Sequence, residues 1–556
     1  MKMKNKLYTL LMALGVFLIS SCELDYLDNP NAVTETSADA NFLITNIQEK
    51  VSFLFGGVDD QGNNSGLSYH GQKVTRIINQ GSSLYENDYQ PTSFDENWRA
   101  AYSDILIDAK TTKALAEKAG FKRHLGIVKT LEAYTLLSLV DFFGDIPYSE
   151  ALDPSNFNPK ADAGAAVYTA AFELLKSAKA DFTATTSAGT PTDLYYGNNY
   201  VKWEKLVNTL MLKYHLNRKL IDKAGSTSAI AALIAENKLI GTGDDFTFKY
   251  GKVQSDPDTR HPAFAGQHPA GGGDYQSTFY MWHLTEAKGF DDPRVKYYMY
   301  RQVGANSTNP SEIECINEFK PNHYPLDMVF CLPGTRGYWG RDHLNNDGIP
   351  PDNLKRTLWG VYPAGYRFDE GKFAAAGAAD PGNGGAGIQP MLMASYVDFM
   401  LAEAALTLGT SGDAKALMLS GINKSLNFVR SWSLGTSEAA KINATESATL
   451  FTASAKKYSD YVEKEYDATT SATEKMRVIG REYWLALYGN GVEAYNLYRR
   501  TGMPDGMQPG LNPSVGKFPR SFNYPSDYVN RNSNAKQKTD MGVKVFWDNN
   551  PDGFIN

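Results

Sequence analysis

Residues 124–152 read HLGIVKTLEAYTLLSLVDFFGDIPYSEAL, and this stretch decides the fold of the chain. Between Ile127 and Leu137 apolar side chains recur at helical spacing, and further apolar residues fill the flanks. Because so little of the circumference is polar, the pattern predicts a central helix that is buried on most sides. Gly144 can then cap the helix, and Pro147 cannot continue it. The stretch contains no catalytic constellation, so it indicates a core element with a sharp exit.

Length and composition limit the number of domains and the class of protein. The chain has 556 residues, enough for one large core or for two to four domains. Its net charge of -7, with both signs mixed, argues against a nucleic-acid binder. Tyrosine is abundant, with 33 Tyr beside 27 Phe and 8 Trp. Tyr and Trp combine an apolar face with a polar edge, which suits sugar or peptide surfaces as well as ordinary cores.

The N-terminal residues predict export. Three lysines among the first six residues form a basic region, and residues 7–19 are apolar but too short to span a bilayer. Two serines then precede Cys22, which is the pattern of a lipoprotein signal peptide over residues 1–21. Cleavage would leave Cys22 as the first mature residue, with lipid on its sulfur and its amine. The alternative is an ordinary secretory signal followed by a chance cysteine.

The two other cysteines are Cys315 and Cys331. In an exported protein such a pair can oxidise, and a disulfide closing this loop would stabilise the fold by roughly 3 kcal/mol. Two buried free thiols fit the sequence equally well. Beyond the signal peptide no segment could cross a membrane, so we expect a lipid-tethered soluble body.

The pattern along the chain predicts a mostly α protein with a single globular domain over residues 42–556. A polar tether and arm, residues 22–41, precedes it. Helical patterns fill residues 42–240 and 391–505, without a fixed repeat or a tetratricopeptide signature. The expected helices are residues 42–55, 97–119, 124–143, 161–183, 203–224, 394–408, 414–434, 446–466, 471–488 and 492–500.

Residues 241–390 differ from these helical parts in composition and in the spacing of their apolar residues. Gly, Pro, Asn, Asp and aromatic residues dominate, and helical spacing is seen mainly at residues 277–287. An irregular stretch of this size inside a compact domain is rare unless it is functional. We therefore expect a loop-rich lobe with few short strands that holds the ligand. The tail, residues 506–556, is expected to wrap the surface.

Several stretches together resemble the SusD/RagB family of outer-membrane nutrient-binding lipoproteins, in particular its second SusD-like branch. They occur in the family's order over nearly the whole mature chain, and the lipoprotein signal agrees with them independently. The stretches are residues 98–115, LEAYTLLSLVDFFGDIPYSEAL (131–152), WEKLVNTLMLKYHLNRKL (203–220), YVDFMLAEAAL (396–406), EYWLALYGNGVEAYNLYRRTGMP (482–504), and FPRSFNYPSDYVNRN (518–532) with KVFWDNNP (544–551).

The resemblance implies a scaffold of tetratricopeptide-like helix pairs that carries a loop-rich lobe. It also implies a partner, a SusC-type TonB-dependent transporter, over which the lipoprotein sits as a lid and delivers a glycan or peptide. Catalysis and cofactors are not part of that role. Glu23, Asp25 and Asp28 resemble the surface-export tag of Bacteroidetes lipoproteins, which implies an outer-membrane protein that faces the cell exterior.

Aromatic clusters in the loops are the candidate ligand-binding residues. Sugars stack their apolar faces on rings, and polar side chains read their hydroxyl groups. Glycines flank Tyr338 and Trp339 in GYWGRDH, so we expect these rings on an exposed turn, with Arg341 as a hydrogen-bonding partner. The alternative for each ring is packing in the lobe's own small core. Further candidates are Trp359, Tyr362, Tyr366, Tyr280, Trp282, Tyr85 and Tyr89.

Metal and catalytic motifs are weak or absent. Asn345, Asp347 and Asp352 have oxygen-rich spacing and are weak candidates for calcium ligands. The run lacks the first aspartate and the closing glutamate of an EF-hand, so a solvated Asx turn is the preferred interpretation. The sequence contains no HExxH, GxSxG or GK[ST] motif. We therefore predict no metal site, no cofactor and no enzymatic activity.

Four functions fit these observations. The first is a cell-surface lipoprotein that binds an oligosaccharide for import through the transporter. The second is an oligopeptide binder of the same transport type. The third is a secreted all-α glycoside hydrolase, which would need two carboxylates facing each other across a cleft. The fourth is a structural lid whose ligand contacts come mainly from the transporter.

Overall fold

The structure is a computed structural model, and it describes residues 39–57, 65–255, 257–262, 264, 275–348, 351–352, 355–359, 367–374 and 382–555. Helices dominate these residues, and only two strands occur among them. The prediction of a mostly α fold with few short strands is confirmed. Cys22 lies outside the described residues.

The first half of the scaffold runs to α10. Its elements are α2 (Ala40–Gly56), α3 (Leu67–Val74), α4 (Tyr85–Asp88), η2 (Pro91–Phe94), α5 (Asp95–Arg99), the π-helical η3 (Ala100–Leu106), α6 (Ile107–Ala119), α7 (Lys122–Phe143), α8 (Gly164–Thr183), α9 (Tyr200–Arg218) and α10 (Lys223–Glu236).

The lobe and the second half follow. Their elements are β1 (Phe246–Lys249), α12 (Thr278–Thr285), α13 (Val295–Tyr298), η4 (Glu314–Asn317), β2 (Ile388–Leu392), α14 (Ala394–Leu408), α15 (Ala414–Leu434), α16 (Ala439–Thr445), α17 (Ala448–Asp467), α18 (Ala472–Ala486), α19 (Gly491–Thr501) and α20 (Ser526–Arg531).

Helix α7 is the buried centre that the sequence predicts. All of its residues from His124 to Phe143 are buried except Lys129. It packs against α2, α6, α8 and α9. Gly144 follows it with φ +77°, a backbone conformation that residues with a Cβ rarely adopt, and the chain leaves the helix there.

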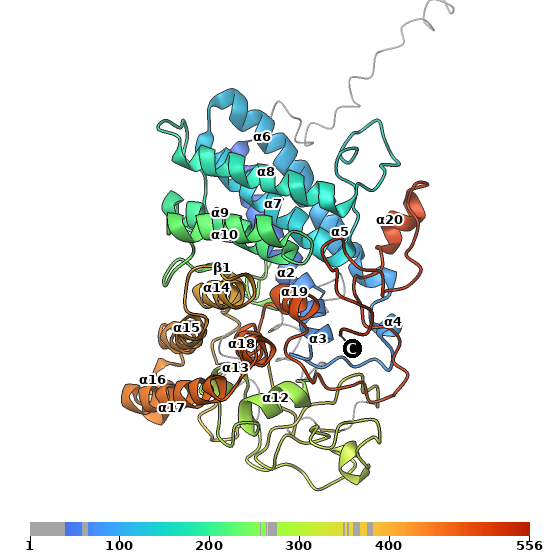
Figure 1. The fold of residues 1–556 in the computed structure, drawn as a ribbon, viewed down its shortest axis with the longest axis vertical. Coiled ribbons are helices and arrows are strands. Elements are labelled where there is room, and N and C mark those ends of the chain that lie inside the picture. The colour runs from blue at the N-terminus through green and yellow to red at the C-terminus, as the bar shows by residue number, and fades with distance from the viewer. Residues whose placement is uncertain are drawn as a thin grey trace, which may run out of the picture.

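The helices stack in two groups (Figure 1). Helices α6 to α10 lie across the view in the upper part, and α14 to α18 are seen closer to end-on below them. The loop-rich lobe, with α12, occupies the lower end of the long axis, and the tail descends along one side from α20. Strands β1 and β2 pair antiparallel, with Phe246 opposite Leu392, and so join the two ends of the lobe at the scaffold.

One predicted helix is two in the structure. The sequence predicts a single helix over residues 203–224, but α9 ends at Arg218 and α10 begins at Lys223. The Asp222 side chain accepts a hydrogen bond from the Gly225 amide at 3.0 Å and caps the second helix. An Asp in a helical pattern can compete for the backbone in this way, and here it starts a new helix.

A buried ionic cluster ties the scaffold together around α7. Lys213 on α9 lies 3.0 Å from Asp141 on α7 and 2.9 Å from Glu493 on α19. Asp141 also accepts hydrogen bonds from Asn496 at 2.7 Å and from the indole of Trp547, in the tail, at 2.9 Å. The two carboxylates outweigh the effect of burial, which alone would lower the pKa of Lys213, and raise that pKa. One carboxylate therefore connects two helices and the tail to the central helix.

None of the described helices combines the length and the apolar character that a membrane-spanning helix needs.

Candidate functional site

The two rings expected on an exposed turn are buried. Tyr338 is 2% exposed and Trp339 is 3% exposed. The flanking glycines serve close packing, since a Cβ on Gly340 would lie 1.9 Å from the carbonyl oxygen of Gln276. The expectation of an exposed aromatic turn is therefore wrong, because the glycine admits a neighbouring backbone rather than solvent.

The surroundings of this turn explain its burial. Trp339 packs in a small core that includes Cys315 and Cys331, which the structure joins in a disulfide. Arg341 is also buried: its Nη1 donates to the carbonyl oxygen of Asp347 at 2.5 Å, and its guanidinium lies 4.4 Å from the centre of the Tyr275 ring. These residues hold the lobe together and offer no open ring face.

Apart from Tyr85, the remaining aromatic candidates divide into three groups. Tyr280, Tyr89 and Trp359 are buried, which is the alternative of core packing rather than an open ligand contact. Tyr280, for example, donates to the carbonyl oxygen of Leu485 at 2.9 Å and serves the core. Trp282 is half-buried on α12. Tyr362 and Tyr366 lie outside the described residues.

The weak calcium candidates are used in local hydrogen bonds. The Asn345 side chain accepts from the Asp347 amide at 2.8 Å, which is the geometry of an Asx turn. Asp352 accepts from the Tyr275 hydroxyl at 2.7 Å. Within the described residues, no group of three His, Cys, Asp or Glu side chains is arranged to hold a metal ion.

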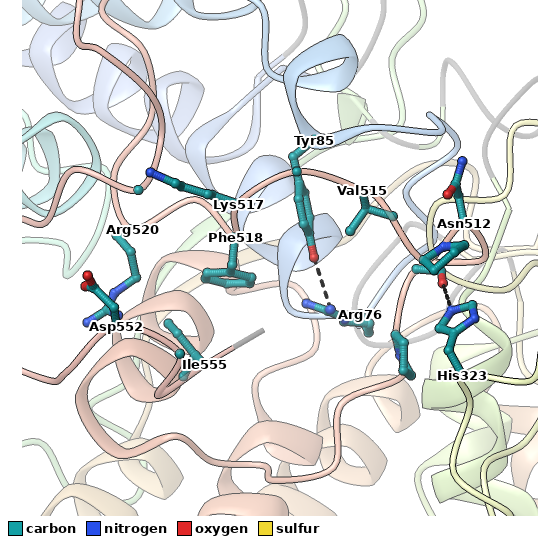
Figure 2. A pocket seen from close by; sticks show the side chains of 16 residues that line it. Arg76, Tyr85, His323, Asn512, Val515, Lys517, Phe518, Arg520, Asp552 and Ile555 are labelled. Atoms are coloured by element: carbon teal, nitrogen blue, oxygen red, sulfur yellow. Dashed lines mark hydrogen bonds between the residues drawn. The ribbon is translucent and has the colours of Figure 1, made fainter.

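The last candidate, Tyr85, is also buried, at 1% exposed, but its side chain lines a cavity of about 480 Å³, which we call the tail cavity (Figure 2). Its other walls come from Arg76, from His323 in the lobe, and from tail residues between 509 and 520 and between 552 and 555. Three segments far apart in sequence therefore meet here. The volume lies within the range of small-molecule sites.

One wall of the tail cavity is fixed by Arg76. This residue has φ +59°, and its guanidinium donates to the carbonyl oxygen of Gln508 at 3.1 Å and to the Tyr85 hydroxyl at 3.1 Å. Tyr85 also lies 3.1 Å from Nε2 of His343. Burial raises the pKa of Tyr85 and lowers that of His343, so the phenol and the imidazole are both neutral at pH 7. The Phe518 ring packs edge-on against Tyr85, with ring centres 5.9 Å apart, and its centre lies 5.8 Å from the Arg76 guanidinium (Figure 2).

The rim on the lobe side is fixed by two neighbouring residues. Nε2 of His323 lies 2.9 Å from the carbonyl oxygen of Gly510. The Tyr324 hydroxyl donates a hydrogen bond to the carbonyl oxygen of Pro509 at 3.0 Å. His323 and Asn512 are both exposed and lie at the same end of the cavity (Figure 2). Their polar side chains can meet a ligand without a change in the fold.

The charged residues at the other end are already paired. Lys517 lies 2.7 Å from Asp540, and Nε of Arg520 donates to Asp548 at 2.6 Å. Asp552 pairs with Lys544, whose hydrogen bond and charge lower the pKa of Asp552. A wall of neutralised charges offers hydrogen bonds without demanding a charged ligand.

Sequence reasoning missed most of this cavity. The sequence predicts that the tail, with Lys517, Phe518 and Arg520, wraps the surface, whereas these three residues line the cavity. The basic and aromatic residues of KFPR, beside the glycines at 510 and 516, were the available signal. Nothing in the sequence indicates that Arg76 and His323 face them.

The comparisons with known proteins agree with this architecture. The model of a family described as "Starch-binding associating with outer membrane" matches residues 30–319, and that of "Susd and RagB outer membrane lipoprotein" matches residues 386–548. The chain therefore belongs to the SusD-like family of outer-membrane lipoproteins. It is a nutrient-binding protein of the outer membrane, and the proteins of this family are binding proteins. None of the curated proteins matches it.

Solved structures share the fold at low sequence identity. A SusD/RagB family protein from Bacteroides thetaiotaomicron is 17% identical with a TM-score of 0.65, over 93% of this chain and 100% of the other. A SusD homolog from Bacteroides uniformis is 17% identical with a TM-score of 0.61, over 92% and 99%. A chitin-binding protein is 19% identical with a TM-score of 0.59, over 92% and 100%.

Proposed function

We propose that this protein, anchored through lipid on Cys22 at the cell exterior, binds a neutral oligosaccharide in the tail cavity and delivers it to a SusC-type TonB-dependent transporter. The single observation behind the ligand class is the cavity wall, which joins the half-buried Val515 and the edge of the largely buried Phe518 to exposed polar side chains and to charges that are already neutralised. A polyhydroxylated ring needs an apolar contact and hydrogen bonds, and it brings no charge that would remain unpaired.

The rival ligand is an oligopeptide. A free peptide carries two charged termini, and each would need an opposite charge at the site. Lys517, Arg520 and Asp552 already have partners, so a charged terminus would have to displace one of them. Because breaking one of these ion pairs costs free energy, the site favours the uncharged oligosaccharide over the peptide.

The hydrolase alternative gains no support from the cavity. Glycoside hydrolysis uses two carboxyl groups, one of which is held protonated by a raised pKa. Among the described lining residues of the tail cavity, Asp552 is the only carboxylate, and its pKa is lowered. The site favours binding without hydrolysis.

The test is calorimetry on the chain from Asp25 to Asn556. The titrants are neutral malto-, chito-, manno- and xylo-oligosaccharides and a mixture of short peptides. We expect binding to one of the saccharide series and none to the peptides. His323→Ala and Asn512→Ala should each weaken it by about 1 kcal/mol for a lost hydrogen bond, roughly fivefold.

Asn309 provides a matched control. It is exposed like Asn512, and each side chain accepts a hydrogen bond from the amide two residues later. Asn309→Ala should leave binding unchanged, because Asn309 does not line the cavity. Peptide binding without saccharide binding would replace the proposed ligand class. No binding to any titrant would favour the structural-lid interpretation.

The transporter part has its own test. The lipoprotein, solubilised with its membranes and purified through a tag, should carry a TonB-dependent transporter in comparable amount. A lipoprotein that purifies alone under conditions that keep membrane complexes intact would contradict the proposed partner and leave the ligand proposal standing.

A further inference from the structure

A second cavity, of about 430 Å³, lies between α5, α20 and the loop over residues 151–159. We call it the aromatic cleft. It shares no lining residue with the tail cavity. The π-helical turn η3 contributes Tyr102 to it, and such turns are frequent at functional sites. The cleft is therefore a distinct feature of the scaffold half of the molecule.

Three rings form one side of the aromatic cleft. The Trp98 ring centre lies 4.7 Å from that of Tyr102 and 4.8 Å from that of Tyr528. Trp98 and Tyr528 are each 8% exposed, and Tyr102 is half-buried, so the cluster is anchored in the core. The Tyr102 hydroxyl donates to the carbonyl oxygen of Pro147 at 2.7 Å, which helps to make the cluster a rigid, mainly apolar surface.

Phe157 completes the lining and is 82% exposed. Its loop is nevertheless well fixed. The Asn158 side chain accepts from the Ser533 amide at 2.7 Å, and the Asn532 side chain donates to the carbonyl oxygen of Pro159 at 2.8 Å. The hydrogen bonds of the loop keep the large Phe157 ring exposed to water, which is unfavourable for an apolar group. A ligand that covers the ring would remove this apolar surface from water, and the fixed loop would lose little conformational freedom on binding.

The rim of the aromatic cleft is polar and balanced in charge. Arg531 and Asp527 pair across one helical turn at 3.0 Å, and both side chains are more than half exposed. Arg99 is also exposed and pairs with Glu96, and the Asp95 side chain accepts a hydrogen bond from the Asp527 amide at 2.9 Å. Both arginines of the rim therefore already have carboxylate partners, which suits a neutral ligand with several hydroxyl groups.

We propose that the aromatic cleft is a second saccharide-binding site, in which a sugar ring stacks on Phe157 and is hydrogen-bonded by the rim. The inference rests on the proposed function for its ligand class, but not on the tail cavity. A polysaccharide long enough to reach both sites binds more tightly than a short oligosaccharide, because the second contact becomes intramolecular.

The test compares Phe157→Ala with Phe319→Ala. Phe319 is 96% exposed and lies outside the aromatic cleft, so the two changes remove the same exposed ring and neither disturbs the core. Retention on starch, chitin, mannan and xylan is measured by affinity electrophoresis or pull-down, and the matching oligosaccharides by calorimetry. We expect Phe157→Ala to weaken binding to the retained polysaccharide roughly two- to tenfold, with no effect of Phe319→Ala.

Asn512→Ala, in the tail cavity, separates the two proposals. Loss of binding with Asn512→Ala but not with Phe157→Ala overturns the second site and leaves the proposed function intact. Loss of binding with Phe157→Ala but not with Asn512→Ala supports the second site and overturns the proposal that the ligand binds in the tail cavity. If Phe157→Ala and Phe319→Ala weaken polysaccharide binding equally, the exposed rings act only through general surface hydrophobicity, and the inference of a second site is overturned. A wild-type protein that binds none of the four polysaccharides overturns both proposals.

Discussion

At the residue scale, Lys213 is the cation at the junction of three scaffold helices. It is 1% exposed and balances Asp141 and Glu493, both buried. A buried ion pair contributes little net stability when complete, but the loss of one partner leaves a buried charge uncompensated. The helices α7, α9 and α19 therefore depend on one ammonium group at their junction.

Lys213→Met should lower the free energy of unfolding by roughly 3–5 kcal/mol, because two carboxylates remain buried without a cation. Urea denaturation followed by circular dichroism measures the change. Lys456→Met is the control, since its pair with Asp460 is exposed and should contribute less than about 1 kcal/mol. Equal midpoints for the two variants would show that the buried cluster tolerates the loss.

Single residues also mark the limit of what the sequence predicts. The aromatic candidates of the lobe were identified by type, but the sequence does not tell an exposed ring from a buried one. The glycine at position 340 predicts an exposed turn, whereas in the structure it makes room for the Gln276 carbonyl. Close approach and exposure both require glycine, so the residue type alone could not separate them.

At the scale of elements, the disulfide between Cys315 and Cys331 closes the loop that contains His323 and Tyr324. These two residues hydrogen-bond the tail at Gly510 and Pro509. The two cysteines are 16 residues apart in sequence. Closing a loop of about this length restricts the unfolded chain and contributes about 3 kcal/mol. The lobe and the rim of the tail cavity should therefore loosen together when the bond is removed.

The double variant Cys315→Ser/Cys331→Ser should lower the free energy of unfolding by about 3 kcal/mol. Amide hydrogen exchange should accelerate within residues 315–331, while α7 keeps its protection. Mass spectrometry of exchange, compared with wild type, measures both. Unchanged exchange in the loop would mean that its contacts with Gly510 and Pro509 suffice to hold it.

The elements themselves were largely predictable. Residues 394–408 and 414–434 form helices with the predicted bounds, because their apolar spacing is regular and a glycine follows each. The pairing of β1 with β2 was not predictable, since short strands from opposite ends of an irregular segment carry no local signal. The break between α9 and α10 depended on one capping aspartate.

At the scale of the whole molecule, buried glutamates set the response to acid. Burial alone would raise the pKa of Glu403, but Arg500 and Lys219 outweigh it and lower the pKa from 4.5 to about 2. Glu482, close to Lys288, Arg481 and Arg294, is lowered to about 2 in the same way. A depressed carboxyl pKa stabilises the fold above pH 4.5, and this contribution is lost as the pH falls toward 2.

Denaturation midpoints should therefore fall as the pH is lowered from 4.5 to 2, beyond what exposed carboxyls contribute. Glu403→Gln should be less stable at pH 7, since Arg500 and Lys219 lose their partner, and its stability should change less over the acid range. Urea titrations at several pH values compare the two proteins. Parallel pH profiles would rule out Glu403 as a source of the acid sensitivity.

The candidate site was the least predictable part because it exists only at this scale. Arg76, His323 and Phe518 line one cavity but are separated by hundreds of residues, and helical periodicity gives no information on such distances. The resemblance to the family located the scaffold, whose segments carry the recognisable motifs. It did not locate the walls of the cavity.

The tail links the centre of the scaffold to the tail cavity. Residues near position 550 close the tail cavity, and Trp547 supplies one of the hydrogen bonds to Asp141 at the centre of the scaffold. The tail therefore completes both the core and the cavity. A change that loosens the tail would act on the wall of the cavity and on the hydrogen bond to Asp141 together.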